Sequence, residues 1–330
     1  MNKNIKKIAA VLTAGLILTG CNKNTAINAN KSEAESPIDT KEIIQAAEWN
    51  NEVIDKTIGE NEEKNIIKAK VNILSDDIYE GSIKKEFPTV EMIEKELCDG
   101  KKMDDVSDVY NSDLEDGDEA GKSYEIYDKE SDILDRTYWY DDNVGEYGLF
   151  EYDSFHFHNW DSPASFTDAK RDDELILCED TLAALNMNVK AKDSYDGKKR
   201  NCTYKIVNFY NTLENIPVVR KETGMELTTV KMVDSQIVNI RFAPEYEFTS
   251  DKKKVDKIIN PESLMEIVEK DFLDGKLTGY PDDVIDKITL CYMENEENYV
   301  IPVWALSIYW GNMDNVVYVY DAVNGNLIIK

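Results

Sequence analysis

The feature that most constrains the fold is a faint repeat in the C-terminal half of the chain. Two segments have the apolar spacing and start signals of helices, "DELILCEDTLAAL" from Asp173 and "PESLMEIVEKDFL" from Pro261, the second capped by Asn260. Each is followed by a segment typical of a strand, "CTYKIVNFYNTL" and "VIDKITLCYMEN". Because both copies show the same order, we expect two related units rather than one irregular domain.

The second part of each copy predicts an antiparallel meander. Ile-Pro-Val begins a further strand at 216–218 and again at 301–303, a position that tolerates proline. Each copy then ends in a hairpin, turning at Asp234-Ser235 and at Asn324-Gly325. The sequence therefore predicts an α+β fold in which a helix packs on a curled antiparallel sheet. An open edge at a proline-led strand is the predicted place for a partner to dock.

The closing strands carry a recognisable set of residues: Pro302, Val303, Trp304, Tyr320, Asp321, Ala322 and Gly325, and Pro217 echoes it in the first copy. With these residues the strands resemble those of PepSY-type domains and of related extracytoplasmic regulators of cell-wall sensor kinases. The resemblance implies a tandem pair of PepSY-like, cystatin-like units at 171–255 and 256–330. It also implies non-catalytic, often inhibitory or regulatory roles. As a whole, the chain resembles uncharacterised lipoproteins of gut Clostridia.

The region 37–170 predicts a helix-plus-sheet arrangement. Asp39 and the spacing of apolar residues up to Ile58 indicate a first helix, ended by Gly59. "NIIKAKVNIL" predicts a strand, and "TVEMIEKELCDG" predicts a second helix from Thr89. The aromatic-rich stretch 124–160 favours antiparallel strands with one polar face.

The N-terminus indicates export and anchoring. Residues 1–20 combine early lysines with a short apolar run, which is typical of a signal peptide and too short to span a membrane. Leu18-Thr19-Gly20-Cys21 resembles the lipobox of bacterial lipoproteins, which implies a diacylglyceryl group on Cys21. The polar stretch 21–36 predicts a flexible tether. We therefore expect a protein held by its lipid on the extracytoplasmic face of the cell membrane.

The net charge limits the classes of partner, and the spacing of the cysteines limits the kinds of site. The formal net charge of −28 disfavours nucleic acid and favours basic partners or loosely held divalent cations. Beyond the anchor, no cysteine pair has the spacing of a zinc site. Cys178 falls on an apolar helical stripe, which predicts a core thiol, and the disulfide state stays open. No cofactor is expected beyond a weakly held divalent cation.

Two histidines offer a candidate metal site. His156 and His158 lie two residues apart in "DSFHFHNWD", so in a strand they point to one face. Asp153 or Asp161 could complete a metal site and support a metal-assisted hydrolase. A solvated strand face explains the same pattern. The sequence favours a non-enzymatic protein without excluding an enzyme.

Three aromatic residues offer a second candidate site. Trp139, Tyr140 and Trp160 could stack on sugar rings, although core packing explains most aromatics in a sheet. The favoured function is a binding or regulatory protein that acts through protein–protein contact. The alternative is a surface lipoprotein that captures a glycan or solute.

Overall fold

A computed structural model describes most of the chain after the expected tether. Residues 1–34 and 35–330 form separate units, and nothing is described of the first. No helix among the described residues is long and apolar enough to cross a membrane. The described ranges are 38–39, 50–60, 63–75, 77–108, 121–128, 133–141, 148–152, 166–199, 202–220, 224–277, 284–294, 298–310 and 313–329.

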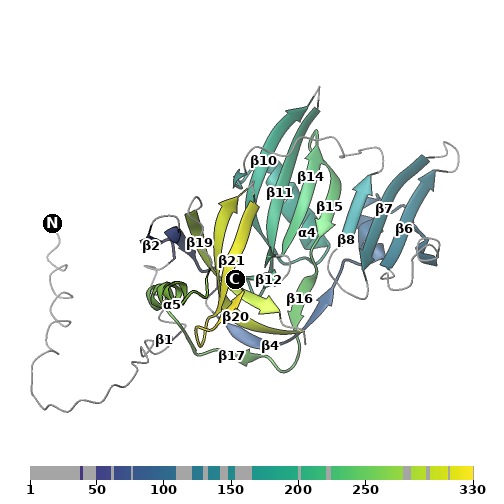
Figure 1. Cartoon of the computed structure of the whole chain (residues 1–330). Helices are drawn as coiled ribbons and strands as arrows, with labels where there is room; N and C mark the ends of the chain where they lie inside the picture. Colours follow the sequence, from purple (N-terminus) through teal and green to yellow (C-terminus); the bar gives the residue numbers. More distant parts are fainter. Residues whose placement is uncertain are drawn as a thin grey trace, which may run out of the picture. The chain divides into compact units, whose positions relative to one another are not determined.

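The described residues form mostly sheet with three helices, which confirms the α+β class (Figure 1). The helices are α2 (Val90–Leu97), α4 (Asp173–Ala184) and α5 (Pro261–Leu273). Each begins after a side chain that accepts a hydrogen bond from the first turn: Thr89, Asp172 and Asn260. Because these signals are local, all three helices were predictable from the sequence.

The first sheet is antiparallel throughout its pairings, and it includes the aromatic-rich strands. Its central strands follow α4, and strands from the N-terminal half extend it beyond β15. In spatial order it contains β9 (Thr167–Asp168), β10 (Val189–Lys199), β11 (Cys202–Leu213), β14 (Leu227–Val233), β15 (Gln236–Phe242), β8 (Gly148–Tyr152), β7 (Ile133–Asp141), β6 (Gly121–Asp128) and β5 (Asp104–Asp105).

The second sheet is mixed. It joins two early strands to the strands that follow α5, and β3 runs parallel to β19. In spatial order it contains β2 (Val53–Glu60), β3 (Glu63–Asn72), β19 (Val284–Glu294), β20 (Tyr299–Trp310), β21 (Met313–Asp321) and β22 (Leu327–Ile329).

Shorter strands link the two sheets. β12 pairs with β11 of the first sheet and runs parallel to β19 of the second. β4 pairs with β16, β17 and β20. These linking strands are β12 (Ile216–Arg220), β13 (Gly224–Met225), β4 (Tyr79–Glu86), β16 (Glu245–Phe248) and β17 (Lys253–Lys254). Separately, β1 (Ile38–Asp39) pairs with β18 (Lys257–Ile258).

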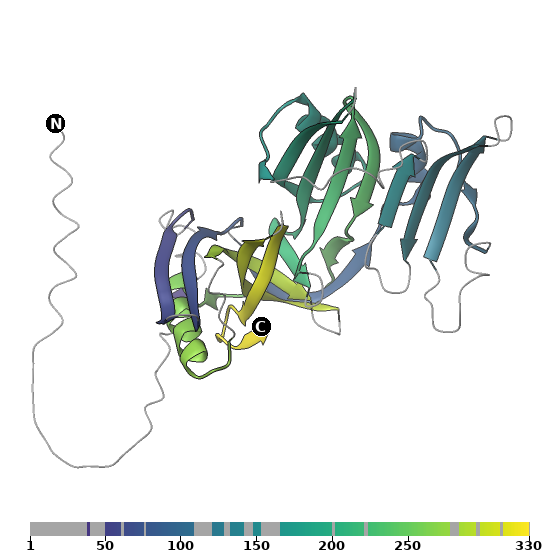
Figure 2. The ribbon, with the colours of Figure 1, turned by 45° about the horizontal axis from the view of Figure 1, so that its top comes forward.

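Each sheet buries a core against helices. Leu175, Cys178 and Leu182 of α4, together with Ile93 of α2, pack on the first sheet. Leu264, Met265 and Val268 of α5 pack on the second sheet. In Figure 2 the ribbon of α5 lies against β2, where Lys56 bonds Glu269 at 2.6 Å. The order of helix and then antiparallel meander thus occurs twice, as α4–β10–β11–β14–β15 and α5–β19–β20–β21–β22.

The first predicted helix is wrong over the part of it that the structure describes. Val53–Glu60 forms strand β2, while residues 40–49 lie outside the described part. Side chains in this strand alternate, with Val53 and Asp55 exposed and Ile58 buried. The apolar positions of this segment fit both the helical period and the strand period, and pairing with β3 selects the strand.

The strand-by-strand alignment of the two copies also needs correction. β10, which the sequence pattern did not single out, precedes β11, so the meander position of β11 corresponds to that of β20. Pro217 lies in linking strand β12, whereas Pro302 lies in β20 between β19 and β21. Neither proline-led strand is an open edge, because β12 also pairs with β19. The predicted docking place at such an edge is therefore wrong.

Candidate functional site

The predicted anchor and metal site lie outside the described residues. This holds for Cys21 and for all four candidate ligands, His156, His158, Asp153 and Asp161. Within the ranges that the structure describes, no group of three or more His, Cys, Asp or Glu side chains could hold a metal ion. The anchor and the histidine site remain predictions.

Two of the three predicted stacking residues are described, and both lie in β7. Tyr140 faces the helix side, where its ring centroid lies 5.3 Å from that of Tyr138 and 5.7 Å from that of Phe87. Adjacent residues of a strand point to opposite faces, so Trp139 lies on the other side of the sheet. Its indole covers Gly121, where a Cβ atom would collide with it. The two rings form no common platform, and Trp160 lies outside the described residues.

The described cysteines are free thiols in or near the cores. Cys178 faces the core from α4, as its helical spacing predicts, with its sulfur 3.4 Å from that of Met232. Burial raises the pKa of Cys178 to about 12 and that of Cys98 to about 11. A thiol with so high a pKa is a poor nucleophile near neutral pH. These two cysteines therefore act as packing groups.

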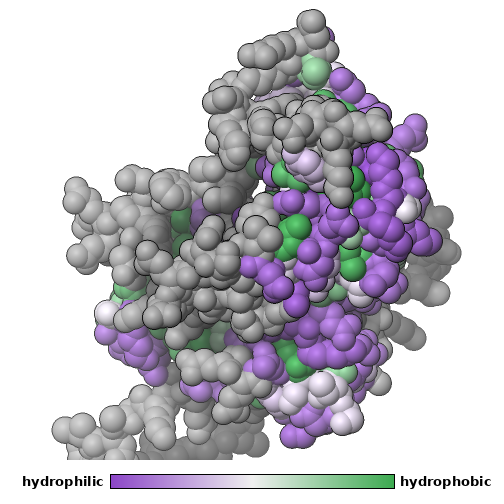
Figure 3. Space-filling view, turned by 90° about the vertical axis from the view of Figure 1, so that its right-hand side faces the viewer, coloured by the Kyte–Doolittle hydropathy of each residue, from purple (hydrophilic) through white to green (hydrophobic). Residues whose placement is uncertain are grey.

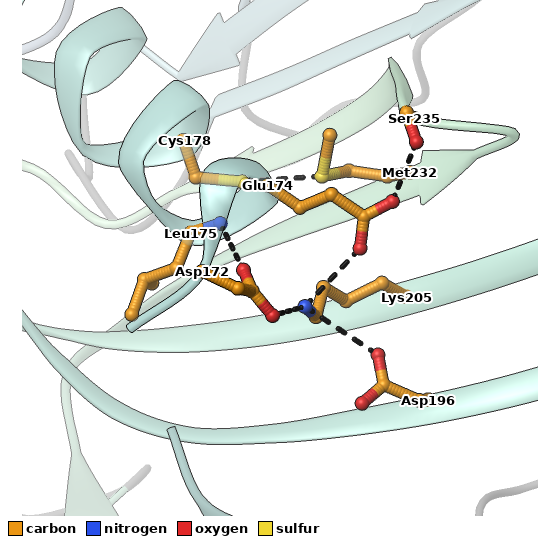
Figure 4. A network of polar contacts seen from close by, with 8 residues as sticks. All are labelled: Asp172, Glu174, Leu175, Cys178, Asp196, Lys205, Met232 and Ser235. Atoms are coloured by element: carbon orange, nitrogen blue, oxygen red, sulfur yellow. Dashed lines mark hydrogen bonds and ion pairs between the residues drawn. The ribbon is translucent and has the colours of Figure 1, made fainter. Parts of the chain in front are cut away.

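The densest cluster of charges lies at the N-terminus of α4 (Figure 4). Lys205, on β11, faces the helix side because it shares the alternation of Val207 and Phe209. Its ammonium donates to the Asp172 carboxylate and lies 3.1 Å from a Glu174 oxygen and 3.5 Å from an Asp196 oxygen. The Lys205 side chain is 5% exposed, so this is an almost fully buried ammonium among carboxylates.

The Lys205 cluster joins helix α4 to the first sheet. Asp172 also accepts the backbone N–H of Leu175, and Glu174 accepts the Ser235 hydroxyl at 2.7 Å. Burial alone would lower the pKa of Lys205, but the hydrogen bonds to Asp172 and Glu174 hold it above its usual range. The amine thus stays protonated and cannot act as a nucleophile. The sequence contained a signal for this site, because a lysine that alternates in register with the core residues of a strand must be buried or paired.

A second buried cluster lies where the linking strands meet. The Arg220 Nε atom of β12 lies 2.9 Å from a Glu226 oxygen and 3.7 Å from a Glu294 oxygen. Lys85 of β4 reaches Glu294 at 2.6 Å. Burial raises the pKa of Tyr246, whose ring belongs to the core of the second sheet, so this hydroxyl stays neutral. The cluster ties β12 and β4 to the end of β19.

Uncharged side chains fix the bend between β15 and β16. Asn211 is fully buried, and its amide donates to the carbonyls of Ala243 and Pro244, each at 3.2 Å. Thr228 donates to Asn211 at 2.7 Å and accepts the Ala243 N–H at 3.1 Å. Satisfied buried polar groups of this kind specify one backbone path.

Comparison with known proteins shows the fold only. No protein-family model matches the chain, and no curated protein matches it. The structure is similar to that of an uncharacterized protein from Eubacterium rectale ATCC 33656, with a TM-score of 0.58 and 15% sequence identity over 89% of this chain and 99% of that one. The similarity shows that the arrangement is shared by another bacterial chain.

A second solved structure shows a weaker similarity. YycH from Bacillus subtilis matches with a TM-score of 0.38 and 13% identity, over 83% of this chain and 59% of that one. A score this low does not establish a common fold.

Proposed function

We propose that this chain is a lipid-anchored extracytoplasmic protein that binds and regulates a protein partner without catalysis. The anchor would be the diacylglyceryl group on Cys21, and 21–36 would be the tether. The proposal rests mainly on one face of the first sheet. α2 and α4 pack on the other face, and no described helix covers this one.

The row of side chains across this uncovered face has the composition of a protein interface. Trp139 lies opposite Leu149, Leu149 opposite Arg241, and Arg241 opposite Thr229. Arg241 is exposed, and the other three are partly exposed. Trp and Arg are enriched among the residues that dominate binding energy. We call these four residues the Trp139 row.

The wider surface suits a polar contact. On the side shown in Figure 3, the described surface is mostly hydrophilic, and apolar residues are scattered among polar ones. Together with the net charge of −28, this favours a partner with a basic surface. Such contacts give specificity and fast association more than high affinity.

We also propose that the two helix-and-meander units are the PepSY-like units expected at 171–255 and 256–330. Their support is the repeated order of one helix and four antiparallel strands. The structure changes how they can be tested, because the second unit shares its core with β2 and β3. Deleting the second unit would expose that core and unfold the protein.

The test is crosslinking of the anchored protein in cells, followed by purification and mass spectrometry. The double variant Trp139→Ala, Arg241→Ala should remove a recurrent partner. Lys270→Glu, an exposed charge reversal on α5, should retain it. Equal recovery of the partner by both variants would move the contact away from the Trp139 row.

Trp139 also supports the alternative of glycan capture. A partly exposed indole beside polar side chains can stack on a sugar ring. A glycan array distinguishes the two functions. Binding of a glycan that is lost in Trp139→Ala, together with no crosslinked protein, would favour capture over regulation.

A further inference from the structure

The outward face of β2, β3 and β19 differs in charge from the protein as a whole. In β3, Ile67, Ala69 and Val71 are buried toward α5, so Lys68 and Lys70 point outward, and both are exposed. We call the following outward residues the lysine face: Val53, Ile66, Lys68, Lys70, Val284 and Lys287.

The lysine face concentrates positive charge. Lys70 lies directly opposite Lys287 in the parallel pairing of β3 with β19. Like charges placed directly opposite each other in a sheet repel. On the outward side these three lysines share the face with Asp55, which lies directly opposite Lys68, although the chain as a whole has a net charge of −28.

Lys68 and Lys70 also differ from several other lysines of the described part in their bonding. Lys56 and Lys254, for example, each pair with a carboxylate of the same chain. Neither Lys68 nor Lys70 makes an ion pair with any residue that the structure describes. Their charges are therefore available to an external anion.

Apolar side chains accompany the lysines. Val53 is 64% exposed and Val284 is 38% exposed, two of the few large apolar residues that are exposed in the described part. Val284 lies opposite Ile66, which is partly exposed, and Val53 lies opposite Lys70. Apolar groups beside lysines are typical of surfaces that sit at the level of lipid headgroups.

We propose that the lysine face docks on anionic lipid headgroups of the membrane that holds the anchor. This inference rests on the proposed anchoring at Cys21. The charge of the whole chain opposes such a contact, so it needs both a local excess of lysine and a high local concentration of lipid. A short tether supplies that concentration, since it makes the contact intramolecular. Docking would then select which face of the protein meets the membrane.

The test is lysine labelling of the full lipidated protein reconstituted in vesicles. An amine-reactive reagent is applied with anionic phosphatidylglycerol–phosphatidylcholine vesicles and, in parallel, with phosphatidylcholine alone. Mass spectrometry reads the rate at each lysine. We expect labelling of Lys68 and Lys70 to slow about fivefold or more on the anionic vesicles, and the effect to vanish in high salt. Lys190 and Lys198, both exposed on β10, are the internal controls.

Matched variants separate docking from anchoring. In the double variant Lys68→Glu, Lys70→Glu, the reagent should label Lys287 at the same rate on both vesicle types. In the double variant Lys190→Glu, Lys198→Glu, labelling of Lys68 and Lys70 should still be slower on the anionic vesicles. Cofloatation with vesicles reports the anchor independently. If the protein floats but Lys68 and Lys70 label equally on both vesicles, the docking proposal is wrong and the anchor stands. Protection in detergent micelles would show that protein covers the face, which also overturns it. If the protein does not float, the proposed anchoring is wrong, and docking, which rests on it, falls with it.

Discussion

The α4 unit and the α5 unit share one arrangement but hold their helices in different ways. At the start of α4, a buried ammonium bonds the capping carboxylate, so ions join helix to sheet. At the start of α5, Asn260 caps the helix, and the Trp304 indole donates to the Ile259 carbonyl at 2.9 Å. All of these α5 groups are neutral. The same topology therefore tolerates an ionic or a neutral attachment at the start of the helix, although α5 is also joined to β2 by the Lys56–Glu269 ion pair. The two helix starts should respond differently to salt and pH.

The largest expected effect is at Trp304, the biggest fully buried side chain of the second core. Trp304→Ala should lower the free energy of unfolding by about 3–5 kcal/mol, because it leaves a cavity and an unpaired carbonyl. Denaturant titration measures the loss. Trp304→Phe keeps most of the volume and should cost less. A loss below about 1 kcal/mol for the alanine variant would mean that α5 is held elsewhere.

The second effect concerns Lys205. Lys205→Met leaves the three carboxylates without their cation and should cost about 2–3 kcal/mol, less than a fully buried pair because Asp172 and Asp196 are partly exposed. Hydrogen exchange should show faster opening of α4 and β11 than of α5 and β20. Lys190→Met, at an exposed site on β10, is the control and should leave exchange unchanged. An equal increase in hydrogen exchange in both units would contradict a local role of Lys205.

The third effect is a dependence on pH through Glu245. Burial raises the pKa of this carboxyl from 4.5 to about 7, although Asn188 donates to it and opposes the shift. The folded state then binds the proton more tightly than the unfolded state. Stability from this group is complete below about pH 4.5, falls as pH rises and is lost above about pH 7. The expected loss is about 1–3 kcal/mol.

Glu245→Gln removes this titration, so its stability should change less between pH 5 and 8. Thermal unfolding in matched buffers compares the two proteins. Glu247→Gln, on the same strand but exposed, is the control. If Glu245→Gln kept the full change in stability between pH 5 and 8, another group would be responsible for it.

The smallest effect compares the two caps. Asp172→Ala and Asn260→Ala should each cost about 1 kcal/mol through the lost cap. Asp172→Asn keeps a capping oxygen and removes only the charge facing Lys205. Raising the salt concentration should narrow the difference in stability between wild type and Asp172→Asn but leave the effect of Asn260→Ala unchanged. Equal salt responses would remove the distinction between the units.

Local signals predicted much of the fold, and long-range pairing accounts for what they missed. The capping residues fixed α2, α4 and α5, and the Asp234-Ser235 and Asn324-Gly325 turns were correctly placed. β2 was mistaken for a helix because Ile54 and Ile58 suit both periods, and its partner β3 decides. β10 was missed because its lysines and aspartates resemble a loop, although charges suit a strand that has only the two-residue β9 on its outer side.

The candidate site was harder to predict than the fold. Lys205 could have been singled out by its register with Val207 and Phe209, yet its three carboxylates come from separate segments. The Trp139 row and the lysine face depend on strand order, such as β15 beside β8 and β3 beside β19. No local pattern in one sequence encodes such neighbours.

The joining of β2 and β3 to the far end of the chain sets the time at which the second core can form. Lys56 bonds Glu269, 213 residues later, and β3 can complete its pairing only when β19 is available. If the chain is exported with its N-terminus first, as proposed, β2 and β3 can pair with each other early, but β3 lacks its partner β19 until that strand emerges. The second core would then form only late in export. A chain that stalls early keeps Ile67 and Val71 exposed, and proteases can then remove it.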